Sequence, residues 1–257
     1  MSMDQQSTPR RVAWVTGAGT GIGRALAKRL AQDGWHVAAS ARTARDLDSL
    51  AAEVPGHITC FQLDVTDEAA AAETGRAIEA ALGPVDLAVL NAGNYFPTTA
   101  ADFSVDNFHR TVDVNLLGTI NCMGPIVPSM VKRRTGHILV TGSLTGFVGL
   151  PTAASYGATK AALNSKVEAF RPDFEQYGVT ISIINPGFVK TPLTDKNKFP
   201  MPFLIGVDEA VDHIMHGLED KRVAINFPWQ MTLAVKFLAA LPAWAKFGIT
   251  RRMLQKD

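Results

Sequence analysis

The stretch Val12-Ala-Trp-Val-Thr-Gly-Ala-Gly-Thr-Gly-Ile-Gly23 decides the fold of this 257-residue chain. Its apolar start, 12–16, predicts a buried strand, and a helical pattern follows over residues 23–33. The four glycines between them allow a tight turn and the close approach of a ligand. The free amides and positive dipole end of the helix attract a phosphate. An ordinary glycine turn is the alternative, but the strand before it and the helix after it favour nucleotide binding.

Apolar runs alternate with helical patterns along the rest of the chain. The expected strands are 12–16, 36–41, 57–63, 87–91, 137–141, 180–185 and 223–227. The expected helices are 23–33, 44–53, 68–82, 105–131, 155–177 and 208–218. Several strand candidates are apolar throughout, which is typical of strands covered on both faces. The pattern predicts a single-domain, Rossmann-like, doubly wound α/β fold: a mostly parallel, seven-stranded sheet with helices on both faces.

The composition fits a soluble globular enzyme, with 47% hydrophobic residues, 19% charged residues and a net charge of +1. This balance gives no reason to expect nucleic-acid binding. Cys60 and Cys122 are expected to be small buried groups, and the lack of a disulfide framework favours a cytoplasmic protein. Residues 1–10 are polar and predict a disordered tail and no signal peptide. No apolar stretch of about 18 residues is expected to span a membrane.

Tyr156 and Lys160 stand at i and i+4 in Ser155-Tyr-Gly-Ala-Thr-Lys160, and Ser143 precedes them at the end of an apolar run. This spacing places the phenol and the ammonium on one side of a helix. A nearby cation favours the phenolate, so we expect a lowered pKa for Tyr156 and proton exchange with a substrate oxygen. Ser143 can hydrogen-bond the same oxygen. A surface Tyr–Lys pair is the alternative interpretation of this motif alone.

Arg42 follows the second expected strand, where an acidic residue would accept a hydrogen bond from a ribose 2′-hydroxyl. The first acid after this strand is Asp46. Arg42 can contact a 2′-phosphate, which favours NADP(H) over NAD(H), and Thr20 can add a hydroxyl. A solvent-facing Arg42 is the alternative.

The assembled motifs resemble those of the short-chain dehydrogenase/reductase family. They are Thr16-Gly17-x-x-x-Gly21-x-Gly23, Asp64-Val65, Asn91-Ala92-Gly93, Asn115, Ser143, Tyr156-x-x-x-Lys160 and Pro186-Gly187-x-x-x-Thr191. The resemblance covers about 12–191, with Leu90 standing where many relatives carry a second Asn.

The resemblance implies a role for each site residue. Tyr156 donates and accepts the proton, Lys160 lowers its pKa and binds the nicotinamide ribose, and Ser143 orients the substrate. Asn115 holds a water that links Lys160 to solvent. The implied cofactor contacts are Gly17, Thr20, Gly21, Ile22, Gly23, Arg42, Asp64, Val65, Asn91, Gly93, Tyr156, Lys160, Pro186, Gly187, Val189 and Thr191.

Substrate contacts are expected from the segments 94–97, 145–150 and 188–206, and the last of these is expected to form a proline-broken apolar lid. No basic cluster there calls for an anionic substrate, so a hydrophobic ketone, aldehyde or alcohol is favoured. A surface loop packed on the core is the alternative. The resemblance also implies a homodimer or homotetramer formed through helices 105–131 and 155–177.

The C-terminal extension, 229–257, follows the catalytic domain expected at 11–228 and is rich in apolar and aromatic residues with flanking lysines. Peripheral membrane contact through 229–250 is one interpretation. Packing against the pocket or a partner subunit is the other.

Two further functions remain open at this point. A non-catalytic NAD(P)-binding sensor or scaffold would normally lack Ser143, Tyr156, Lys160 and Asn115, whereas an epimerase or dehydratase of the same fold could keep them. No metal site is expected, because His213 and His216 lie among surface charges without a third ligand.

Overall fold

A computed structural model describes residues 11–195, 197 and 199–254, so the tail predicted at 1–10 lies outside the described residues. Its centre is a seven-stranded sheet in the order β3-β2-β1-β4-β5-β6-β7, and every recorded strand pair is parallel. The strands are β1 (Val12–Thr16), β2 (His36–Ala41), β3 (Ile58–Gln62), β4 (Leu87–Leu90), β5 (His137–Thr141), β6 (Thr180–Pro186) and β7 (Ala224–Phe227). The predicted doubly wound fold is confirmed.

The chain runs outward from β1 to β3, then returns to the other side of β1 and continues to β7. The direction of winding therefore reverses between β1 and β4. In such sheets, ligands bind in the crevice at the carboxyl ends of the strands beside this reversal. The topology alone places the glycine loop after β1 next to the segment after β4.

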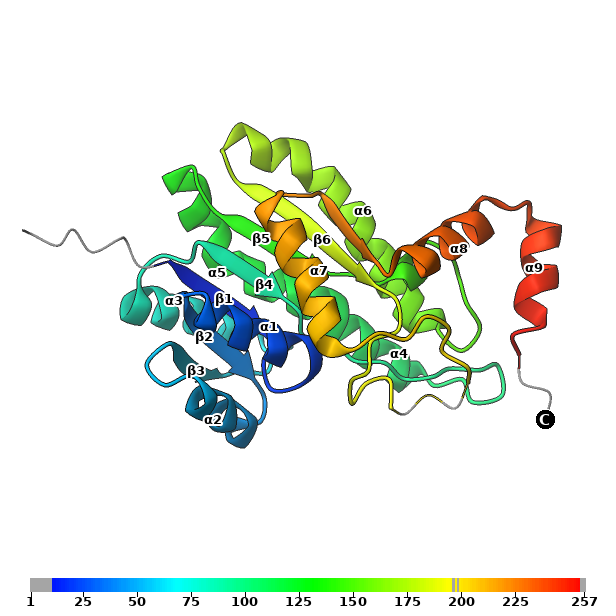
Figure 1. Ribbon diagram of the computed structural model, residues 1–257, viewed down its shortest axis with the longest axis horizontal. Coiled ribbons are helices and arrows are strands. Elements are labelled where there is room, and N and C mark those ends of the chain that lie inside the picture. Colours follow the sequence, from blue (N-terminus) through cyan, green and yellow to red (C-terminus); the bar gives the residue numbers. More distant parts are fainter. Residues whose placement is uncertain (1–10, 196, 198, 255–257) are drawn as a thin grey trace, which may run out of the picture.

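Helices cover both faces of the sheet, and Figure 1 shows α1 and α7 in front of it. One layer contains α1 (Gly21–Gln32), α2 (Ala44–Glu53) and α7 (Val207–Glu219). The opposite layer contains α3 (Glu68–Leu82), α5 (Gly118–Arg133) and α6 (Ala154–Gln176). Strand β1 shows why two layers form: Ala13 and Val15 join the first core, whereas Val12 and Trp14 join the second. Successive strand residues point to opposite faces, so a strand apolar throughout needs cover on both.

The helix predicted at 105–131 is more complex than expected. It consists of α4 (Val105–Val112), a π-helical turn, η1 (Asp113–Leu117), and α5. The combined segment Val105–Arg133 is long and apolar enough, by length and composition, to cross a membrane, so the expectation of no such stretch was too strong. A core helix of a soluble protein meets the same criterion, and Cys122, Ile126 and Met130 are buried beneath the sheet.

Two helices form the C-terminal extension: α8 (Trp229–Ala240) and α9 (Ala243–Arg251). The inner side of α8 packs on the short helix η2 (Leu144–Gly146), which directly follows Ser143. Val235 and Leu238 are buried there with Leu144 and Val148. The extension therefore supports the segment next to the predicted active site.

Candidate active site

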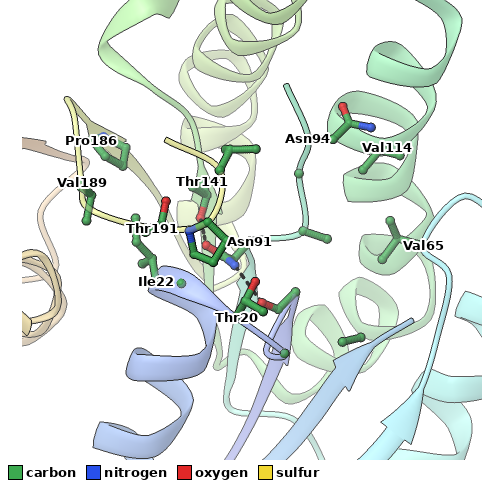
Figure 2. A pocket seen from close by; sticks show the side chains of 18 of the residues that line it. Thr20, Ile22, Val65, Asn91, Asn94, Val114, Thr141, Pro186, Val189 and Thr191 are labelled. Atoms are coloured by element: carbon green, nitrogen blue, oxygen red, sulfur yellow. Dashed lines mark hydrogen bonds between the residues drawn. The ribbon is translucent and has the colours of Figure 1, made fainter. Parts of the chain in front are cut away.

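A cavity of about 410 Å³ lies at the carboxyl ends of β1, β2, β4, β5 and β6. It is lined by 16 of the 18 residues predicted for the site; the exceptions are Gly23 and Asn115. Figure 2 shows Ile22, Val189 and Thr191 on one side and Val65 and Val114 on the opposite side, with Asn91 between them. The fold thus gathers residues as far apart in the sequence as Gly17 and Thr194.

The glycine loop after β1 has the backbone that its sequence predicts. Gly17 and Gly21 have φ angles of +66° and +56°, in the left-handed region that favours glycine. Thr20 precedes α1 without a side-chain capping hydrogen bond, so the amides of the first helical turn face the cavity without this partner. This arrangement can hold a phosphate.

Gly23 packs behind the loop after β1, and its predicted contact with the cofactor stays a prediction. A Cβ at this position would clash with the Gly17 carbonyl oxygen and the Asn91 side-chain nitrogen. Gly23 does not line the cavity. Its lack of a side chain lets α1 approach the loop after β1 and the Asn91 side chain, so Gly23 shapes this loop from behind.

Arg42 lies at the far end of the cavity, at the carboxyl end of β2. Its side chain is exposed, and among the described residues no carboxylate forms an ion pair with it. Thr43 begins α2 without a side-chain cap, which leaves another helix start beside Arg42. Asp46 also lines this end. The site therefore offers a guanidinium and a helix start, with one carboxylate nearby.

The segments after β3 and β4 also line the cavity. Asp64 accepts hydrogen bonds from the Thr66 amide (3.0 Å) and hydroxyl (2.8 Å), which fixes the turn that carries Val65. The amide of Asn91 donates to the Thr16 hydroxyl at 3.0 Å, and its side-chain nitrogen donates to the Thr16 carbonyl at 3.3 Å. Asn91 thereby joins the ends of β1 and β4 and sets the spacing of the two loops.

Ser143, Tyr156 and Lys160 meet on one wall of the cavity. The Ser143 hydroxyl donates to the Pro186 carbonyl at 3.4 Å and accepts from the Thr145 amide at 3.2 Å. The Lys160 ammonium lies 5.5 Å from the centre of the Tyr156 ring and donates to the Thr141 carbonyl at 2.7 Å. The i,i+4 prediction of a shared helix face is confirmed by this contact.

The electrostatics of this group differ from the sequence prediction. Burial raises the pKa of Tyr156 to about 12, and the nearby Ser143 hydroxyl partly offsets this change. Burial also lowers the pKa of Lys160 to about 7. The expected lowering of the Tyr156 pKa by Lys160 is therefore wrong. The cause is burial, which removes water from both groups and so disfavours the phenolate of Tyr156 and the ammonium of Lys160.

Asn115 lies behind this wall in the π-helical turn, and its side chain is fully buried. Its oxygen accepts from the Asn94 amide at 2.8 Å, and its nitrogen donates to the Asn94 carbonyl (3.0 Å) and the Thr159 hydroxyl (3.2 Å). Asn115 therefore braces the loop after β4 against the helix that carries Tyr156 and Lys160. The water-holding role implied by the resemblance stays a prediction.

Several residues of the site were missed by sequence reasoning. Thr141 holds Lys160 through its main-chain carbonyl, which the side-chain type does not reveal. Tyr95 packs edge-on against Tyr156, with ring centres 5.3 Å apart, and its hydroxyl lies 3.1 Å from that of Thr152. Met231 of α8 lies where it would contact a Cβ on Gly187 at 3.1 Å. Of these, only Tyr95 carried a signal, because it lies in the segment 94–97 from which substrate contacts are expected, one residue beyond the start of that segment.

Among the described residues, no group of three or more His, Cys, Asp or Glu side chains is placed to hold a metal ion. Both cysteines are free: Cys122 is buried, as expected, but Cys60 is only partly buried. Neither lines the cavity.

Comparisons with known proteins agree with this architecture. The family model described as short chain dehydrogenase matches residues 11–200. An uncharacterized oxidoreductase of Myxococcus xanthus is 37% identical over 235 residues, or 90% of this chain and 93% of the relative. One from Staphylococcus epidermidis is 30% identical over 217 residues, or 84% and 94% of the two chains.

Two solved structures show the same fold. A short-chain dehydrogenase from Streptomyces avermitilis superposes with a TM-score of 0.84 over 96% of this chain and 97% of its own, at 23% identity. An alcohol dehydrogenase from the archaeon Thermococcus sibiricus, complexed with 5-hydroxy-NADP, gives a TM-score of 0.76 and 28% identity. That match covers 85% of this chain and 95% of the archaeal one.

Proposed function

The chain belongs to the short-chain dehydrogenase family of NAD(P)-dependent oxidoreductases, and we propose that it uses NADP(H) to interconvert a hydrophobic ketone or aldehyde and its alcohol. One observation carries this proposal. Tyr156, Lys160 and Ser143 share a cavity with a glycine loop whose backbone is shaped for a dinucleotide phosphate. A hydride carrier and a proton donor can therefore act on one carbonyl group.

The loop after β1 and the first turn of α1 are proposed to bind the pyrophosphate, and the 186–191 segment to cover the nicotinamide. The fit rests on the left-handed Gly17 and Gly21 and on the close approach of the two segments. A Cβ on Gly21 would lie only 3.3 Å from the Thr191 methyl group. When bound, the dinucleotide supplies or accepts the hydride.

Tyr156 is proposed to exchange the proton with the substrate oxygen, while Ser143 orients that oxygen. In reduction, the neutral phenol gives its proton to the oxygen that gains negative charge. The raised pKa of Tyr156 keeps it protonated at neutral pH and therefore suits this direction. In oxidation, a positive charge on Lys160 would favour the phenolate that is needed to accept the proton.

Preference for NADP(H) is proposed from the environment of Arg42. An arginine and an uncapped helix start both attract a 2′-phosphate, whereas Asp46 repels it. Because two groups here attract the 2′-phosphate and one repels it, we favour NADP(H) over NAD(H). The related alcohol dehydrogenase from T. sibiricus was solved with an NADP derivative, which agrees with this choice.

A hydrophobic substrate is proposed from one apolar residue that lines the cavity and from aromatic residues next to it in the sequence or packed on its lining residues. Tyr95 flanks Tyr156, and Leu193 lines the cavity. Phe188 and Phe199 of the segment proposed as the substrate lid pack edge-on, with ring centres 5.9 Å apart. Such walls recognise an apolar body beside a polar reacting group.

We also propose a homodimer or homotetramer formed through α4–α5 and α6. Leu117, Ile120 and Phe170 expose large apolar side chains on these helices. An exposed apolar group of this kind is typical of a subunit interface. The catalytic domain at 11–228 and the extension at 229–257 are retained as a proposed division of this subunit.

The Tyr156→Phe variant tests the proposed reaction. Purified wild-type protein is first screened with hydrophobic ketones, aldehydes and alcohols, following NADPH or NADP by absorbance. The variant should lose at least about a thousandfold in turnover, because it lacks the transferable proton. Its NADPH affinity, measured by fluorescence titration, should stay within about threefold of the wild type, since only the hydroxyl is removed.

Tyr95→Phe provides a matched control, because it removes a neighbouring hydroxyl group, which lies 3.1 Å from the Thr152 hydroxyl. It should retain turnover. A fully active Tyr156→Phe variant would refute the assigned role. Product analysis by mass spectrometry separates a redox reaction from epimerisation or dehydration, and cofactor binding without any turnover would favour the sensor or scaffold alternative.

A further inference from the structure

Helix α8 is apolar on two sides, but only one of them is covered. Val235 and Leu238 on the inner side are buried against the segment that follows Ser143. Trp229, Leu233 and Phe237 follow one another at four-residue spacing and are 64–70% exposed. Residues at this spacing lie on one helix face, so they form an outward apolar stripe. A helix that is apolar all round is normally buried or in contact with lipid.

Helix α9 adds further exposed apolar side chains to those of α8. Trp244 is 80% exposed and Phe247 is 57% exposed, and Met253 and Leu254 follow just beyond the helix. Figure 1 shows α9 standing apart from the body of the protein, joined to it through α8. A helix of nine residues gains little stability from its own hydrogen bonds in water, so it needs a surface on which to fold. Within the described residues, the rest of the subunit supplies little of that surface.

The charges of this segment all have one sign. The sequence has no Asp or Glu from Lys221 to Lys256, although Asp and Glu together contribute 24 residues to the whole chain. The same stretch contains seven lysines and arginines. Arg251 and Arg252 are exposed at the end of α9, and Lys246 is partly exposed within it. This part of the chain is therefore basic, in contrast to the nearly neutral protein as a whole.

We propose that helices α8 and α9, with the residues to Leu254, bind the surface of a membrane that contains anionic phospholipids. Trp and Phe side chains insert at the level of the lipid headgroups, where an aromatic ring and a nearby polar phase are both accommodated. Lys246, Arg251 and Arg252 would contact the lipid phosphates. This surface is distinct from the cavity, and its binding does not depend on the identity of the substrate.

Charge favours a membrane over a second copy of this chain as the occupant. In a symmetric contact the same patch would face itself, bringing Arg251, Arg252 and Lys246 of two subunits together with no acidic residue of the patch to offset them. An anionic lipid surface instead complements every charge in the segment. Two exposed tryptophans, Trp229 and Trp244, also match the side-chain type most enriched at membrane interfaces.

Vesicle co-sedimentation of the full-length protein tests this proposal. The vesicles are phosphatidylcholine alone or phosphatidylcholine with 30% phosphatidylglycerol, each at low and high salt. Wild-type protein should bind the anionic vesicles at least about tenfold more tightly than the neutral ones, and salt should weaken this binding. The double variant Trp244→Ala/Phe247→Ala should lose about tenfold or more in affinity, because two inserted rings are removed.

Two further variants separate the apolar from the electrostatic contribution. The variant Lys246→Gln/Arg251→Gln/Arg252→Gln should bind anionic vesicles only as weakly as the wild type binds neutral ones. Phe103→Ala removes a ring that is 66% exposed in another part of the protein, and it should bind vesicles like the wild type. Thermal unfolding midpoints verify that all variants are folded.

Equal sedimentation of wild-type protein with and without vesicles would overturn the proposal, as would unchanged binding by the aromatic double variant. Analytical ultracentrifugation tests the alternative that a second copy of this chain binds the surface. A fall in oligomer size on Trp244→Ala/Phe247→Ala, without vesicle binding by the wild type, would assign the surface to contacts between copies. Turnover of a water-soluble substrate without vesicles should be unchanged in these variants, so failed binding remains distinguishable from failure of the proposed reaction.

Discussion

Replacing Lys160 by methionine should change how the stability of this protein depends on pH. Lys160 is 3% exposed, and burial lowers the pKa of its ammonium from 10.5 to about 7. Between these two values, the unfolded chain holds a proton at this position and the folded protein does not. The free energy of unfolding therefore rises with pH in this window, and the stabilisation present above pH 10.5 is lost as the pH falls toward 7.

The size of the effect follows from the same two values. At about 1.36 kcal/mol per pKa unit, the complete window corresponds to roughly 5 kcal/mol. Between pH 7 and pH 9, the wild type should gain about 2 kcal/mol relative to Lys160→Met. Loss of the hydrogen bond to the Thr141 carbonyl shifts the variant by about 1 kcal/mol at every pH, so it leaves the slope unchanged.

Urea unfolding of the cofactor-free protein, followed by circular dichroism at pH 7, 8 and 9, measures this difference. Subtracting the free energy of unfolding of the variant from that of the wild type cancels the groups that titrate in both proteins. Lys166 is one of them, because burial lowers its pKa to about 8. Lys132→Met is the matched control, because Lys132 is exposed on α5. That variant should follow the wild-type profile. Parallel profiles for the wild type and Lys160→Met would refute the argument that desolvation controls Lys160.

Three further substitutions test other parts of the site. Arg42→Ala should weaken NADPH binding about tenfold and leave NADH binding nearly unchanged, as measured by fluorescence titration, and equal losses would remove the assigned phosphate contact. Asn115→Ala leaves polar groups of Asn94 and Thr159 unpaired and should lower the free energy of unfolding by about 2–4 kcal/mol, a loss that urea titration would detect. Gly23→Ala should cost about 1–3 kcal/mol in the same assay through the clash behind the loop, whereas Gly124→Ala, in open space on α5, should cost nothing.

The order of strands and helices was predictable because it rests on local patterns. Strand β1 and its glycine loop appear as a continuous apolar run followed by closely spaced glycines, and a parallel sheet brings such segments to one edge. The helix face shared by Tyr156 and Lys160 follows from helical geometry alone. These features require no knowledge of distant contacts.

The features that the sequence did not reveal depend on distant partners. The pKa of Tyr156 is set mainly by burial, and the Tyr–Lys spacing says nothing about which groups exclude water. Asn115 binds groups 21 and 44 positions away. The role of Gly23 becomes visible only when the Gly17 carbonyl oxygen is seen behind it.

Helix α8 serves as a common wall, with Met231 against Gly187 on its inner side and the Trp229 stripe on its outer side. Both sides belong to one short helix, so a small rotation of α8 moves them together. A substitution that rotates α8 would therefore move both Met231, beside the cavity-lining Gly187, and the outward stripe that we propose binds a membrane. Relatives in which the whole of this helix differs should therefore differ both in the surroundings of Gly187 and in the exposed stripe.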